Sequence, residues 1–363
     1  MEGVSESTLS YVNPMIKFAC RLILANLLTT LLAVAGQPAQ QPTPETGSNS
    51  AVVAQAQALL TAGKVDAAIE MLRSLPAATA STNTTVNYLL GVAYYQKSDY
   101  DRAIDHLSVA VREIPEDSRQ HRQAVEMLGL SHYLRGHLKE AIPHLEQVAT
   151  WSPSNVEIAY VLGLSYIQTQ NPNKARESFA RMFSIQPSSA AAHLINAQMM
   201  IRQRFENVAE KELQRALELD PKLPQANFLL GELAIFNANI DRGIEFLQRE
   251  IAINPAFGMA YYRLGEAYTR QLKWDEAVAP LQKSIWLNPY FSGPYIVLGK
   301  VHLKKGDLSN AETILRRALR MDQNNFSGHH LLAQVLQRAN RLEEAKKEFE
   351  LADRLRTSSE NER

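Results

Sequence analysis

The histidines are the first candidates for chemistry in this chain of 363 residues, because imidazole is a common metal ligand and general base. His132, His137 and His144 fall close together in the sequence, and His329 is followed directly by His330. Metal ligands on one helix need a spacing of three or four residues, whereas His132 and His137 are five apart. His132 also takes a place that tyrosines take elsewhere in the chain. We therefore interpret it as a packing residue and expect no metal site.

The sequence contains no recognisable catalytic motif. It lacks Gly-x-Gly-x-x-Gly, a phosphate-binding loop and the His-Glu-x-x-His signature. Its only cysteine, Cys20, lies in an N-terminal segment that we expect to be removed, which would leave no thiol nucleophile. We therefore expect that the protein is not an enzyme and that it binds no cofactor.

A 34-residue repeat supplies the elements that must position any functional side chain. Units begin near residues 49, 84, 122, 156, 190, 224, 258, 292 and 326. The eighth and twentieth places of every unit are Gly or Ala. The eighth places are Ala56, Gly91, Gly129, Gly163, Ala197, Gly231, Gly265, Gly299 and Ala333. The twentieth places are Ala68, Ala103, Ala141, Ala175, Ala209, Gly243, Ala277, Ala311 and Ala345. Small side chains let two helices of a hairpin approach to about 8–10 Å between axes.

These units resemble the tetratricopeptide repeat (TPR). Its signature is matched in the second unit by residues 91–95, Tyr100, Ala103 and Pro115, and in the seventh by residues 264–268, Trp274, Ala277 and Pro289. The resemblance covers residues 49–359 and leaves 360–363 as a tail. It implies an all-α fold, a right-handed superhelical solenoid of about nine helix-turn-helix repeats. The first helices would line a concave groove, and neighbouring repeats must stack because no unit can bury its own apolar face.

The groove implied by the resemblance is the expected site of function, so we assigned its residues by their place in the repeat. The fifth places of units two to nine are mostly aromatic or apolar: Tyr88, Glu126, Tyr160, Leu194, Phe228, Tyr262, Ile296 and His330. The thirteenth places become basic toward the C-terminus: Gln96, Leu134, Gln168, Arg202, Phe236, Arg270, Lys304 and Arg338. The predicted partner-binding residues are Tyr88, Tyr160, Phe228, Tyr262, Arg270, Lys304 and Arg338.

Aromatic anchors with a few cations are typical of a peptide-binding surface. The row formed by Arg270, Lys304 and Arg338 favours an acidic partner segment. The alternative is a solvated face whose long side chains cover their neighbours. A nucleic-acid partner is not expected, because 38 basic residues are balanced by 38 acidic ones. The oligomeric state stays open.

The N-terminus has the pattern of an export signal. Two basic residues, Lys17 and Arg21, lie just before an apolar run that extends from residue 22 to residue 35. As a helix this run would be about 21 Å long, shorter than the ~30 Å hydrocarbon core of a membrane. Residues 33–35 form a small-x-small cleavage motif. We expect a signal peptide over residues 1–35, with Met15 as a candidate true start, and a disordered linker over 36–48.

Removal of this segment would leave a cysteine-free chain, which suits the periplasm or the cell exterior, and no contact with the membrane. A membrane anchor formed by the uncleaved segment is the alternative. We expect a non-enzymatic scaffold or adaptor of the bacterial cell envelope that binds a segment of another protein in its groove. The alternative function is an accessory subunit of an enzyme that assembles surface glycan or cell wall.

One stretch departs from the repeat pattern. Gly243 replaces the usual alanine, and Glu250 lies near the expected second-helix interface. A glycine inside a helix costs about 1 kcal/mol relative to alanine, and a charge at an interface adds to that cost. We therefore expect the weakest stacking junction near residues 240–255.

Overall fold

The computed structural model describes residues 44–75 and 84–361, and all regular secondary structure in these segments is α-helical. The predicted signal peptide, residues 1–35, lies outside the described segments, as do residues 36–43 of the predicted linker. None of the described helices combines the length and the apolar character needed to cross a bilayer.

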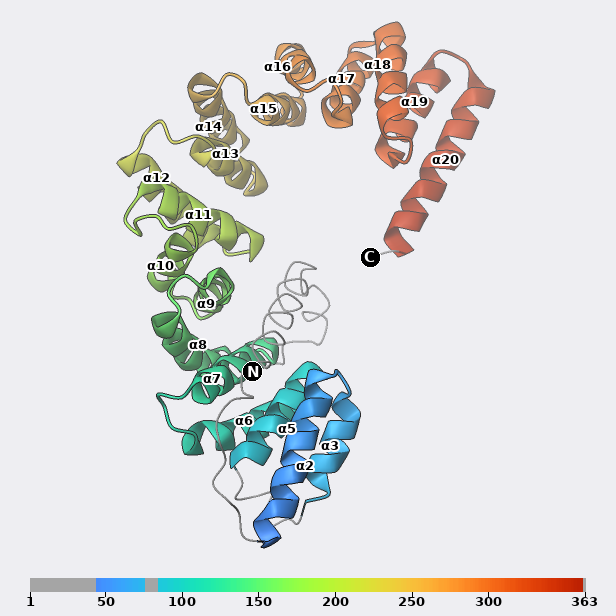
Figure 1. Cartoon of the computed structure of the whole chain (residues 1–363). Coiled ribbons are helices and arrows are strands. Elements are labelled where there is room, and N and C mark those ends of the chain that lie inside the picture. The colour runs from blue at the N-terminus through green and yellow to red at the C-terminus, as the bar shows by residue number, and fades with distance from the viewer. Residues whose placement is uncertain (1–43, 76–83, 362–363) are drawn as a thin grey trace, which may run out of the picture. The chain divides into compact units, whose positions relative to one another are not determined.

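The chain divides after Pro187 into two compact units, and each is a stack of helical hairpins (Figure 1). The first unit contains α2 (Pro44–Thr61) with α3 (Val65–Arg73), α5 (Thr84–Gln96) with α6 (Tyr100–Glu113), α7 (Arg119–Leu134) with α8 (Leu138–Trp151), and α9 (Val156–Gln168) with α10 (Pro172–Met182). The second contains α11 (Ala190–Arg202) with α12 (Glu206–Leu219), α13 (Ala226–Phe236) with α14 (Ile240–Ile253), α15 (Gly258–Arg270) with α16 (Trp274–Leu287), α17 (Ser292–Lys305) with α18 (Leu308–Met321), and α19 (Phe326–Arg338) with α20 (Leu342–Asn361). These nine pairs confirm the predicted all-α solenoid.

Helices extend beyond the repeat region at both ends. Helix α2 begins at Pro44, so residues 44–48 of the predicted linker are helical. Proline suits the first helical position because its φ is already fixed and its missing N–H would have no partner there. Helix α20 continues to Asn361, into the predicted tail.

Small residues mark the places where the two helices of a pair cross. A Cβ atom added to Gly91 would lie 2.6 Å from Leu107 Cγ, and one added to Gly265 would lie 2.5 Å from Leu281 Cγ. The alanines at the eighth and twentieth places are 0% exposed, except Ala345 at 3%. The size requirement inferred from the sequence is therefore met by direct contact.

The turn inside each pair has a repeated backbone conformation. Its fifteenth-place residue has a positive φ in all nine pairs: Gly63, Ser98, Gly136, Gln170, Arg204, Ala238, Leu272, Gly306 and Asn340. Only glycine adopts this region without steric cost, since in other residues Cβ approaches the following carbonyl oxygen. Five of these turns use a residue that is neither Gly nor Asn.

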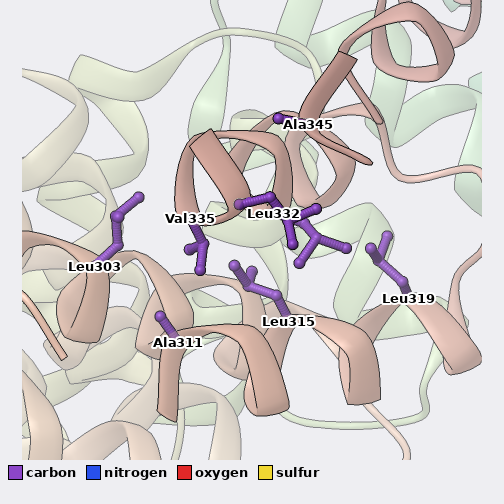
Figure 2. Close-up of a cluster of buried hydrophobic side chains, with 8 residues drawn as sticks. Leu303, Ala311, Leu315, Leu319, Leu332, Val335 and Ala345 are labelled. Carbon is purple, nitrogen blue, oxygen red and sulfur yellow. The ribbon is translucent and has the colours of Figure 1, made fainter. Parts of the chain in front are cut away.

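Leucine and valine side chains fill the space between successive pairs. In Figure 2, Leu315 of α18 lies opposite Leu332 and Val335 of α19. The cluster also contains Leu303, Ala311, Leu319, Leu336 and Ala345, and all of its members are at most 8% exposed. Full burial of such a side chain contributes about 1.5–3 kcal/mol, so stacking stabilises each pair.

Three pairs place a polar contact at one shared register. The fourth place of the first helix meets the twenty-third place, on the second helix. Asn87 Oδ1 lies 3.0 Å from His106 Nδ1. His193 Nδ1 lies 2.9 Å from Glu212 Oε2, and His329 Nδ1 lies 2.6 Å from Glu348 Oε2. Buried polar groups are stable when they are hydrogen-bonded in this way.

The stretch expected to be weak contains a satisfied carboxylate. Glu250 is 0% exposed. Its Oε1 accepts a hydrogen bond from the Gln225 backbone N–H at 2.8 Å, and its Oε2 accepts one from the Phe228 N–H at 3.3 Å. A carboxylate at a helix N-terminus is favourable, because the first N–H groups have no partner within the helix. Glu250 therefore provides hydrogen-bond acceptors for the first N–H groups of α13, and its charge is not left unpaired at the interface between helices.

Candidate partner-binding site

The four predicted aromatic anchors differ in how much surface they offer. Tyr88 is only 6% exposed and its hydroxyl donates to Gln123 Oε1 at 2.9 Å. Burial raises the pKa of Tyr88 to about 12. Tyr88 therefore belongs mainly to the core of the first unit.

The other three anchors are half-buried against neighbouring aromatic rings. The Tyr160 ring centroid lies 6.4 Å from that of Phe179. Phe228 and Tyr262 make edge-to-face contacts with the aromatic residue 29 positions later, Phe257 at 5.0 Å and Phe291 at 5.2 Å. Each of these three rings therefore leaves part of its surface accessible to a partner, and the remainder packs against its aromatic neighbour.

The three predicted basic residues are all exposed but have different surroundings. Arg270 Nη2 lies 3.9 Å from Glu266 Oε1. Arg338 Nη1 donates to the carbonyl oxygen of Leu303 at 3.2 Å, and so binds the last turn of α17. Lys304 lies on that same turn, where a cation favours the negative end of the helix dipole.

A cleft in the second unit brings some of these residues together. Its volume is about 320 Å³, and it lies between α13, α15 and the turn from α11 to α12. Its apolar lining is Ile201, Leu229, Leu233, Ile235, Phe236 and Ala267, and its charged lining is Glu206, Glu232, Arg263, Glu266 and Arg270. Phe236 ends α13 with 74% of its surface exposed. Of the predicted residues only Arg270 lines this cleft.

A short ion-pair network spans the first helices at the cleft. Arg263 of α15 lies 2.8 Å from Glu232 Oε1 of α13 and donates to Glu266 Oε2 at 2.8 Å. Burial raises the pKa of the Glu232 carboxyl above its ordinary value. One guanidinium thus serves two carboxylates, which fixes the side chains on this side of the cleft.

The ninth place of the repeat was missing from the sequence-based assignment. Glu232 and Glu266 occupy it, four residues after the fifth place and four before the thirteenth. Residues four apart lie on one face of a helix, so this spacing could have identified both glutamates. Their shared partner Arg263 occupies the sixth place, and its spacing from the fifth and thirteenth places does not predict that it lies at the same site.

The clustered histidines of the third unit pack against one another. No group of three or more His, Cys, Asp or Glu residues in the described segments could hold a metal ion. The ring of His132 stacks on that of His144 with centroids 6.0 Å apart, and burial lowers the pKa of both. This contact supports the packing role inferred for His132.

Two solved structures are similar to part of this chain at low sequence identity. MamA (residue 41 to the end) from Desulfovibrio magneticus RS-1 is 18% identical with a TM-score of 0.44, over 47% of this chain and 96% of that one. The C-terminal part of a TPR repeat-containing protein from Cytophaga hutchinsonii is 13% identical with a TM-score of 0.45, over 62% and 93%.

Sequence comparison is more specific. BBSome complex member BBS4 from Bos taurus is 30% identical over 151 residues, which are 42% of this chain and 28% of that protein. The chain therefore matches little more than a quarter of this relative. Family models described as tetratricopeptide repeat match residues 53–118, 133–199, 259–289 and 302–359. Stacked repeats of this kind form protein-interaction scaffolds. With nine such hairpins in register, the chain belongs to the tetratricopeptide repeat family.

Proposed function

We propose that this protein is an exported, non-enzymatic scaffold that binds a segment of another protein on the surface formed by the first helices of its second unit. The observation that supports this most directly is the cleft beside Phe236. A large aromatic side chain that is 74% exposed, next to an apolar lining and a fixed ion-pair network, has the composition of an interaction surface.

The partner segment continues from the cleft toward α17 and α19 in this proposal. Arg270, Lys304 and Arg338 are the cations along that path, and an acidic stretch of the partner would lie beside Lys304 and Arg338. Export to the periplasm or cell exterior is part of the proposal, and it rests on the signal-peptide pattern of residues 1–35.

The test is affinity capture from a bacterial envelope extract with the mature chain as bait. A partner should be retained by the wild-type chain and lost with Phe236→Ala. The matched control is Trp286→Ala, which removes an aromatic side chain of α16 that is 71% exposed and does not line the cleft. It should retain the partner.

A second bait carrying Arg270→Glu, Lys304→Glu and Arg338→Glu tests whether the basic row contributes to binding. A partner that survives both Phe236→Ala and this charge reversal would overturn binding on the first helices. Recovery of a glycan in place of a protein would favour the accessory subunit of a glycan-assembling enzyme.

A further inference from the structure

The charged side chains of the cleft do not balance. Three carboxylates, Glu206, Glu232 and Glu266, face two guanidiniums, Arg263 and Arg270, which leaves a net charge of −1. Arg263 is already shared between Glu232 and Glu266. Arg270 is 3.9 Å from Glu266, a distance at which an exposed pair contributes little.

Glu206 holds the uncompensated charge. It is the first residue of α12, and no ion pair joins it to another residue of the described segments. Arg202 and Arg204 lie in the same turn, but neither lines the cleft. Glu206 lies at the N-terminal end of α12, where the helix dipole favours a carboxylate, and it lines the cleft.

The apolar part of the cleft lies within reach of this charge. Phe236 is exposed at its edge, whereas Leu233 is only 5% exposed. A volume of about 320 Å³ falls in the range of small-ligand sites. A site of this size can take side chains of an extended segment.

We propose that this cleft binds a cationic–apolar motif of the partner, in which Lys or Arg adjoins a large apolar residue. The apolar side chain covers Phe236 and Leu229, and the cation lies against Glu206 and Glu232. This inference rests on the proposed function and specifies the chemistry of its ligand. It assigns the cleft a polarity opposite to that expected from the basic row alone.

Three labelled peptides test the proposal on the full mature chain by fluorescence anisotropy. Each has a central Phe with two residues on either side: lysines in the basic probe, glutamates in the acidic probe and serines in the neutral probe. The basic probe should bind at least tenfold more tightly than the acidic probe in low salt, and the difference should shrink as salt screens the charges.

Two neighbouring substitutions should act in opposite directions on the basic probe. Glu206→Gln should weaken its binding about threefold, and Arg270→Gln should strengthen it about threefold, as expected for single exposed charges. Glu276→Gln, which neutralises a first-turn acid of α16 outside the cleft, should leave it unchanged. Both cleft variants change exposed or partly exposed side chains, so they should fold normally.

Equal or tighter binding of the acidic probe would overturn the inference, as would weaker binding of the basic probe to Arg270→Gln or no binding of any probe. In each of these cases a captured partner that depends on Phe236 would leave the proposed function intact. A captured partner that is indifferent to Phe236 would instead overturn the proposed function, whatever the peptides show.

Discussion

Glu250 is a buried carboxylate whose two oxygens accept hydrogen bonds from backbone N–H groups at the start of α13. Glu250→Ala leaves the N–H groups of Gln225 and Phe228 without their acceptor, so it should lower the free energy of unfolding by about 3 kcal/mol. Ser284→Ala, at the same place of the next repeat, removes one hydrogen bond to the Gly258 carbonyl oxygen and should cost about 1 kcal/mol. Urea denaturation followed by circular dichroism measures both.

Exposed Glu245 provides the control for this comparison. Within residues 44–75 and 84–361 its one ion pair is with Arg249, at 3.6 Å, so Glu245→Ala should change stability by less than about 0.5 kcal/mol. If Glu250→Ala were as mild as Glu245→Ala, the buried carboxylate would not support the start of α13, and Glu250 would weaken this junction as the sequence suggests.

Tyr88 gives the molecule a defined sensitivity to alkaline pH. An unfolded tyrosine ionises near pH 10, whereas burial raises the pKa of Tyr88 to about 12 in the folded chain. Between these values the unfolded state loses a proton that the folded state keeps, so stability falls as pH rises. The loss is about 2 kcal/mol at pH 12 and approaches about 3 kcal/mol only at higher pH.

Urea denaturation at pH 8, 10 and 11.5 checks this dependence. Tyr88→Phe should cost about 1 kcal/mol at pH 8, through the lost hydrogen bond to Gln123, and should then decline less steeply. Tyr290→Phe is the control, because Tyr290 is 87% exposed and should leave the curve unchanged. Identical slopes for the wild-type chain and Tyr88→Phe would contradict the assignment.

At the scale of the element, the turn inside each helix pair can be improved. Ala238 has a φ of 62°, and Ala238→Gly should raise the free energy of unfolding by up to about 1 kcal/mol, because glycine adopts this conformation without strain. Gly136 has a φ of 78° with open space around its Cβ position. Gly136→Ala should therefore destabilise by about 1 kcal/mol through backbone strain alone. Thermal unfolding that showed the same sign for both would refute this account.

The helix crossings were predictable from the sequence, but the turns were only partly so. A size requirement is visible in the residue type, as at Gly163 and Ala175. A positive φ is visible only where Gly or Asn meets it. Leu272 adopts a positive φ because the flanking helices α15 and α16 determine the path of the chain. The local sequence does not predict this conformation, because leucine has no preference for it.

The cleft was predictable in part for a related reason. Arg270 and Phe236 both occupy the thirteenth place of their repeats, which the sequence analysis assigns to the groove. Glu232 occupies the ninth place, four residues earlier on the same helix face, and could have been assigned in the same way. The pairing of Glu232 with Arg263 depends on the distance between α13 and α15, which the repeat pattern does not specify.

At the scale of the whole molecule, the export proposal predicts the length of the mature chain. The full sequence produced in a Gram-negative host should yield a periplasmic protein that begins at Gly36 and contains no cysteine, as mass spectrometry can determine. Ala35→Asp should block processing, because signal peptidase requires a small residue there. Recovery of the wild-type chain with residues 15–35 still attached would favour the membrane anchor.

The polar contacts between the fourth and twenty-third places affect how a chain of similar hairpins finds its correct partners. In a repeat protein, the first helix of one unit can dock on the second helix of another during folding. Such an exchange would place His193 against the Phe246 ring or the Pro280 ring, and an imidazole without a partner is costly in an apolar contact. The pairs Asn87–His106, His193–Glu212 and His329–Glu348 therefore disfavour misassembled isomers in which one of these polar groups faces an apolar twenty-third place. They do not separate the fifth unit from the ninth, because both pair a histidine with a glutamate.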